Sequence, residues 1–93
     1  MKTVVFAGTF DPFTAGHLEI TEKAALLFDK VVVAVAEKSK SGVSAGKRAE
    51  IARLSVSDIK NASVEIFDGF LTDYMKNNGY VALIRGIRNV VDF

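Results

Sequence analysis

Two segments near opposite ends of the 93-residue chain carry side chains that could handle phosphate groups. The first spans residues 8–17 (GTFDPFTAGH), in which Thr9 offers a hydroxyl and His17 an imidazole. The second contains Arg85 and Arg88, and a planar guanidinium can hold two oxygens of one phosphate. Such groups can position a phosphate and stabilise the charge that develops on it during group transfer.

The position of His17 indicates an anion at the start of a helix. Thr14 is a favourable N-cap residue, which places His17 at the third helical position. That position usually suits Glu or Gln, and a potential cation gains nothing from the positive end of the helix dipole. A bound phosphate would account for the imidazole, because free N–H groups at a helix start attract anions. The alternative is an exposed histidine in an ordinary strand-to-helix turn.

The elements that must position these groups alternate between short apolar runs and longer amphipathic stretches. Strands are expected at residues 3–7, 30–36, 62–67 and 80–84, and helices at residues 16–28, 47–58 and 70–78. This order predicts an α/β fold with a Rossmann-like parallel sheet, flanking helices and right-handed crossovers. Ligands bind beyond the carboxyl ends of the strands of such a sheet, and both phosphate-handling segments lie there.

The apolar spacing also predicts which helical side chains face the core. In the first helix Ile20, Ala24 and Leu27 share one face, and in the second Ile51 and Leu54 are expected to point inward.

The composition is that of one globular domain over residues 1–93. Lys plus Arg number 12 and Asp plus Glu 11, so nothing indicates a nucleic-acid or membrane-surface partner. The absence of Cys excludes disulfides and thiol chemistry, and a single His argues against a transition-metal site. No run approaches the roughly 20 apolar residues of a membrane span, and no signal peptide is found, so a cytoplasmic protein is expected. The apolar ending at Val90, Val91 and Phe93 suggests an unfinished helix, and the domain is expected to be incomplete at its C-terminus.

Both segments resemble the signatures of one enzyme family. Residues 8–12 (GTFDP) followed by Thr14-x-Gly16-His17 are similar to the signature of the HxGH nucleotidyltransferase superfamily, with Thr14 in place of the first His. Residues 84–93 (IRGIRNVVDF) are similar to the Arg-Gly-Leu-Arg segment of the bacterial phosphopantetheine adenylyltransferases. The resemblance covers the whole chain. It implies transfer of the adenylyl group of ATP to 4′-phosphopantetheine, with release of pyrophosphate, in coenzyme A biosynthesis.

The resemblance also implies roles for individual residues. His17 would donate to the α-phosphate and Thr9 would hold the attacking phosphate, so these two would be catalytic. The ATP-binding residues would be Thr9, Phe10, His17, Gly86, Ile87 and Arg88. The substrate-binding residues would be Thr9, Lys40, Leu71 and Arg85, with Lys38 as the alternative to Lys40.

The remaining expectations concern the metal, the assembly and the alternatives. No side chain is expected as a direct metal ligand, and Mg²⁺ would be held through the ATP phosphates. Asp11 is expected to cap a turn, and Phe10 and Phe13 to pack within their loop. The family implies a homo-oligomer, a hexamer for the complete enzyme, and residues 1–93 alone are expected to be weakly active or inactive. The alternatives are another nucleotidyltransferase of the superfamily, such as a cytidylyltransferase, or a non-catalytic nucleotide-binding module.

Overall fold

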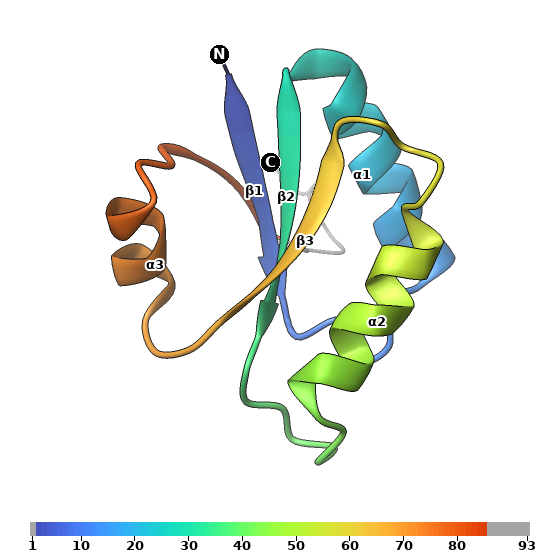
Figure 1. Cartoon of the computed structure of the whole chain (residues 1–93), viewed down its shortest axis with the longest axis vertical. Helices are drawn as coiled ribbons and strands as arrows, with labels where there is room; N and C mark the ends of the chain where they lie inside the picture. Colours follow the sequence, from blue (N-terminus) through green and yellow to red (C-terminus); the bar gives the residue numbers. More distant parts are fainter. Residues whose placement is uncertain (1, 86–93) are drawn as a thin grey trace, which may run out of the picture.

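Four parallel strands form the centre of the molecule in the computed structural model, which describes residues 2–85, with the backbone alone for the last of these. The strands are β1 (Thr3–Gly8), β2 (Lys30–Ala36), β3 (Ala62–Phe67) and β4 (Ala82–Arg85). Their order in the sheet is β3-β2-β1-β4, and every pairing is parallel. This confirms the predicted Rossmann-like α/β fold (Figure 1).

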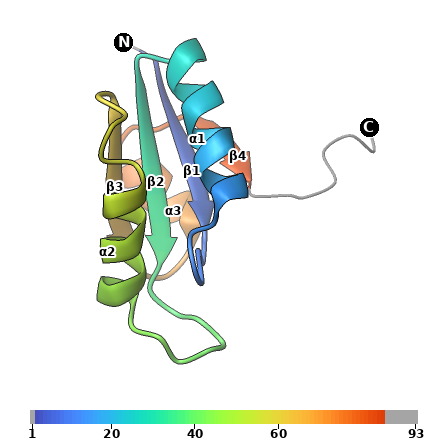
Figure 2. The ribbon, with the colours of Figure 1, turned by 90° about the vertical axis from the view of Figure 1, so that its right-hand side faces the viewer.

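Helices cover both faces of the sheet. They are α1 (Ala15–Leu27), α2 (Ala45–Ser55) and α3 (Leu71–Asn77). α1 and α2 lie on one face, and α3 lies on the other (Figures 1 and 2). None of the helices between residues 2 and 85 has the length and apolar character needed to span a bilayer.

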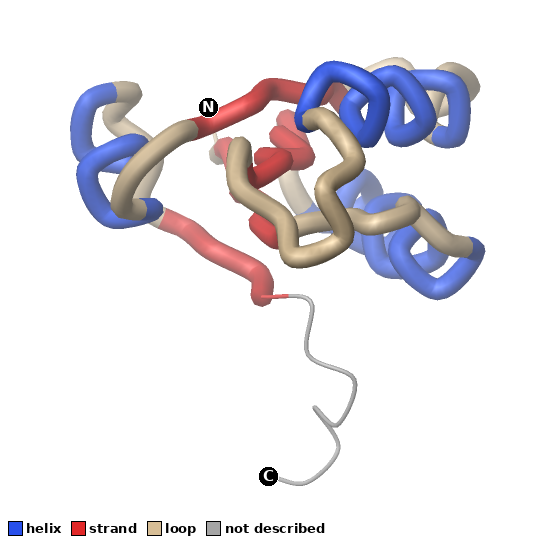
Figure 3. Tube along the Cα trace, turned by 90° about the horizontal axis from the view of Figure 1, so that it is seen from below, coloured by secondary structure: helices blue, strands red, loops and turns tan. Residues whose placement is uncertain are grey.

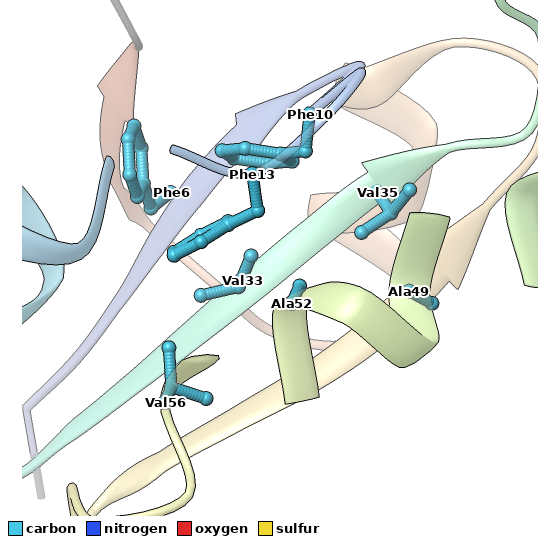
Figure 4. Packing of buried hydrophobic residues seen from close by; sticks show 8 residues of the cluster. All are labelled: Phe6, Phe10, Phe13, Val33, Val35, Ala49, Ala52 and Val56. Atoms are coloured by element: carbon cyan, nitrogen blue, oxygen red, sulfur yellow. The ribbon is translucent and has the colours of Figure 1, made fainter. Parts of the chain in front are cut away.

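The apolar core lies against both faces of the two central strands. On the α1 and α2 side it contains Phe6, Val33 and Val35 from the sheet and Ala49, Ala52 and Val56 from the second helical segment (Figure 4). On the α3 side it contains Val5, Ala7, Val32 and Ala34, against which Leu71, Tyr74 and Met75 pack. Coverage on both faces explains why residues 30–36 read as an unbroken apolar run rather than an alternating one.

The prediction of a buried side chain is wrong at two positions. Leu27 is 76% exposed and Leu54 is 72% exposed. In α1 the buried positions belong to Thr21 and Ala24, and Thr21 can be buried because its hydroxyl donates to the His17 carbonyl at 2.8 Å. In α2 the core positions belong to Ala49 and Ala52 instead of Leu54, which lies on another side of the helix. Ile51 is half-buried and packs against the core as predicted.

The sheet order places its topological switch point beside β1. β2 and β3 lie on one side of β1, whereas β4 lies on the other, with Arg85 paired to Ala7 in the register. Loops emerging from the carboxyl ends of the strands gather over this edge of the sheet (Figure 3). Open α/β sheets bind ligands in the crevice at such a point. The loop that follows β1 (residues 9–14, the first loop) lies next to this switch point.

Candidate functional site

The first loop and the start of α1 enclose a cavity of about 310 Å³ at the carboxyl end of β1. Its lining consists of residues 7–12 together with Thr14 and His17. The structure therefore brings together Thr9, Phe10 and His17, the three predicted site residues of the first segment.

His17 completes the helix cap itself. The Thr14 side chain accepts from the His17 N–H at 3.4 Å, and the His17 Nδ1 accepts from the Thr14 N–H at 2.9 Å. The imidazole thus does what a Glu or Gln does in a capping box. A bound anion is not needed to explain this residue at the third helical position, contrary to the sequence-based argument.

The capping contact also fixes the tautomer of the imidazole. A backbone N–H is always a donor, so Nδ1 must be the acceptor and the proton of the neutral ring resides on Nε2. Burial lowers the pKa of His17 below its ordinary value of 6.5. His17 is therefore a neutral side chain at pH 7 that offers one N–H from Nε2.

Three phenylalanine rings surround the imidazole and hold its plane. Ring centroids of Phe6, Phe10 and Phe13 lie 6.0, 5.0 and 5.4 Å from that of His17. Phe10 is 3% exposed and Phe13 is 6% exposed, so both are packing residues as predicted, but they pack beyond their loop, in the core cluster with Phe6 and Val33 (Figure 4). Phe10 has a φ of 48°, a left-handed conformation that is strained for a residue with a side chain and persists only where its surroundings enforce it.

Asp11 connects the first loop to the second, which spans residues 37–44. Its carboxylate accepts from the Ser39 hydroxyl. Hydrogen bonds from Ser39 and Ser41 lower the pKa of Asp11, with a smaller contribution from the charge of Arg48. Asp11 thus joins two loops, whereas the sequence indicated a cap on its own turn.

Apart from Thr9, the predicted substrate-binding residues do not line this cavity. A second cavity, of about 330 Å³, lies at the ends of β2 and β3 and is lined by residues 36–38 and 67–70. Lys38 is among its lining residues, while Lys40 is exposed and lines neither of these two cavities. Leu71 is half-buried and packs with the core beneath α3. The backbone of Arg85 lies at the carboxyl end of β4; Gly86, Ile87 and Arg88 lie outside the described residues.

Sequence reasoning missed Arg48, which is 1% exposed at the start of α2. Its guanidinium donates to four backbone carbonyls, and one of them is that of Thr9 at 2.8 Å. A signal was available, because Arg48 shares a helical face with the small residues Ala45, Ala49 and Ala52.

The parallel sheet, with a cavity at the loop after β1, is the architecture of a nucleotide-binding α/β family. A family model described as cytidylyltransferase-like matches residues 5–93, and the chain belongs to this family.

Particular relatives point to one activity within the class. The chain is 47% identical over 94 residues to the phosphopantetheine adenylyltransferase of Campylobacter concisus, covering 99% of this chain and 60% of that protein. It is 44% identical over 94 residues to the Aquifex aeolicus protein of the same name, covering 99% of this chain and 58% of the relative. The chain thus spans about 60% of the length of the curated relatives it matches.

A solved structure supports the fold. The crystal structure of NadR protein in complex with NAD and AMP-PNP matches with a TM-score of 0.67 at 20% identity, covering 90% of this chain and 30% of that one.

Proposed function

We propose that the whole protein to which residues 1–93 contribute is a phosphopantetheine adenylyltransferase. It transfers the adenylyl group of ATP to the phosphate of 4′-phosphopantetheine and yields dephospho-coenzyme A and pyrophosphate. The observation that carries this proposal is the cavity at the carboxyl end of β1, where Thr9, Phe10 and His17 meet. The similarity to the curated adenylyltransferases supports this reaction over others of the family.

The reaction is an in-line displacement at phosphorus. A phosphate oxygen of 4′-phosphopantetheine attacks the α-phosphorus of ATP, the bond from that phosphorus to the bridging oxygen breaks, and pyrophosphate leaves. Negative charge grows on the free α-phosphate oxygens in the transition state. In our proposal His17 donates its Nε2–H to one of these oxygens, because Nδ1 is occupied by the Thr14 N–H at 2.9 Å. Thr9 holds the attacking phosphate, so positioning and charge stabilisation supply the rate enhancement.

The other phosphate contacts come from arginines and a lysine. Arg85 would bind the phosphate of 4′-phosphopantetheine and Arg88 the β- and γ-phosphates of ATP, with Gly86 and Ile87 close to the nucleotide. Either Lys40 or Lys38 would reach the substrate from the second loop; the placement of Lys38 at the second cavity supports Lys38. Leu71 directly follows Phe70, which lines that cavity, and would line the pocket of the pantetheine arm.

We propose that a magnesium ion arrives with ATP and is held through its phosphates. Among residues 2–85 no group of three His, Asp or Glu side chains could hold a metal, and the carboxylate of Asp11 already accepts from Ser39. Mg²⁺ is commonly held by substrate phosphates and water with few protein ligands. When bound it would neutralise phosphate charge, while the side chains named above bind and orient the substrates. A cytoplasmic location and a hexameric assembly complete the proposal.

A pyrophosphate-release assay on the whole protein with ATP and 4′-phosphopantetheine tests the function. We expect turnover with ATP, and a loss of about 100-fold or more in kcat for His17→Ala, the size typical for removal of one transition-state donor. Lys23→Ala, an exposed change on the same helix, serves as the control.

Other outcomes would identify the alternatives. Preference for CTP over ATP would indicate a cytidylyltransferase, and nucleotide binding without turnover would indicate a non-catalytic module. Full activity from residues 1–93 alone would contradict the expectation that this part is weakly active or inactive.

A further inference from the structure

Arg48 is a buried cation whose partners are backbone carbonyls. Its Nη1 donates to Thr9 at 2.8 Å and to Ala36 at 2.7 Å. Its Nη2 donates to Glu37 at 2.7 Å, and its Nε donates to Val43 at 2.9 Å. A buried guanidinium needs acceptors for its N–H groups, so these carbonyls take the place of water around it.

The four carbonyls belong to three segments of the chain, of which the one at Thr9 is far from the other two. Thr9 follows β1, Ala36 and Glu37 lie at the end of β2, and Val43 immediately precedes the Ser44 cap of α2. One guanidinium therefore sets the distance between the first loop and both ends of the second loop. The contact between Asp11 and Ser39 joins the same two loops at a separate point.

The bond to Thr9 has a consequence for the next residue. The peptide between Thr9 and Phe10 is trans, so its carbonyl and its N–H point in opposite directions. Because Arg48 holds the Thr9 carbonyl, the Phe10 N–H points away from Arg48. Within residues 2–85 this N–H has no hydrogen-bond acceptor, and Phe10 lines the first cavity.

The strained backbone of Phe10 needs such a restraint. Its φ of 48° is maintained from one side by the ring, which is packed edge-on against Phe6 at 5.1 Å and against His17 at 5.0 Å. Packing of the ring restrains the Phe10 side chain. It does not restrain the rotation of the peptide plane between Thr9 and Phe10, so another contact must do so. The bond from Arg48 to the Thr9 carbonyl supplies that contact.

We propose that Arg48 is a positioning residue of the phosphate cavity: its grip on the Thr9 carbonyl keeps the Phe10 N–H available as a donor to a bound phosphate. The claim that the Phe10 N–H binds a phosphate rests on the proposed function, whereas the claim that Arg48 restrains the Phe10 backbone does not. Lysine is not an equivalent residue here. Its single ammonium carries three donors at one point, so it has no counterpart of the fork that spans four carbonyls.

The test compares Arg48→Lys with the unsubstituted chain by backbone NMR at a temperature where both are folded. The first measurement, without ligand, is the three-bond H–N–Cα–H coupling of Phe10, which reports its φ, together with its amide shift, which reports the surroundings of the N–H. The second is a titration with inorganic pyrophosphate that follows the same amide. We expect both Phe10 signals to change in Arg48→Lys and the affinity for pyrophosphate to fall about tenfold, the loss of roughly one hydrogen bond to a charged group. Arg53→Lys, an exposed change on the same helix, should alter neither.

The outcomes separate this inference from the proposed function. A folded Arg48→Lys chain with unchanged Phe10 signals and unchanged pyrophosphate affinity would overturn the role of Arg48. An unsubstituted chain that does not bind pyrophosphate would count against the proposed site, and the ligand-free Phe10 signals would still decide the role of Arg48. Should Arg48→Lys fail to fold, the hydrogen bond is tested in the unsubstituted chain. Slow solvent exchange of the Arg48 Nη1 protons and a scalar coupling to the Thr9 carbonyl carbon are expected, and absence of both would overturn the proposal.

Discussion

Replacement of His17 by Glu should affect stability and phosphate binding very differently. Glu is the residue that the third helical position favours, and its carboxylate can accept from the Thr14 N–H as Nδ1 does at 2.9 Å. The same carboxylate removes the Nε2–H donor and brings a negative charge to the cavity. The helix cap is therefore kept while the phosphate loses a donor and meets a like charge.

The change in the free energy of unfolding follows from the contacts of the ring. Loss of the ring contacts with Phe10 at 5.0 Å and Phe13 at 5.4 Å costs about 1 kcal/mol. A carboxylate at the helix start returns about 0.5 kcal/mol through the helix dipole. We expect His17→Glu to lose at most about 1 kcal/mol. His17→Ala should lose about 2 kcal/mol, because it also loses the cap.

Phosphate binding should fall much further in the same variant. Loss of one hydrogen bond to a charged phosphate corresponds to about tenfold or more in affinity, and charge repulsion adds to it. Urea unfolding followed by circular dichroism measures the stability, and NMR titration with ATP, whose α-phosphate is the proposed partner of His17, measures the affinity. Lys23→Gln, which makes the same change of one charge unit on an exposed part of α1, is the control. Unchanged ATP affinity in His17→Glu would refute the donor role, and a stability loss equal to that of His17→Ala would refute the capping role.

Three further predictions concern pH, the contact between the loops and the core. Because burial lowers the pKa of His17 below 6.5, the unfolded chain takes up this proton first, so the free energy of unfolding should decrease as the pH falls from 6.5 through the folded pKa. Urea titrations from pH 7.5 to 5 measure this decrease, and it should vanish in His17→Gln, which removes the only histidine. Ser39→Ala should raise the pKa of Asp11 toward 3.8 by removing its largest stabilising contact; an NMR titration of the carboxyl carbon that finds the same pKa would contradict this. Val33→Ala, at a fully buried position of β2, should cost about 2 kcal/mol in urea unfolding, and a cost under about 0.5 kcal/mol would mean that the core has closed around the change.

The strands were predictable because their signal is local. The runs at residues 30–36 and 62–67 match β2 and β3 at both ends. The helix bounds differ by up to three residues, since the ends depend on caps such as Ser44, whose side chain accepts from the Lys47 N–H at 3.1 Å. The buried helix faces were less predictable: the spacing of Leu27 and Leu54 fits a buried face, but tertiary packing selected alanines and Thr21.

The sequence alone determined the order of the elements and the N-cap at Thr14. It also determined that side chains able to bind phosphate, such as Thr9, stand at the carboxyl ends of strands. These features depend on residue types and on spacings within a single element. The free nitrogen of His17 is set by a cap contact with Thr14, only three residues away. Only the tertiary structure decided that Asp11 bonds to the second loop and that Arg48 restrains the first. The partners of Arg48 lie between 5 and 39 residues away along the chain, and all four are backbone carbonyls, three of which are brought to it only when α2 packs on the sheet. Backbone carbonyls are the same at every position of a sequence, so which of them surround a buried guanidinium is set by the three-dimensional packing alone.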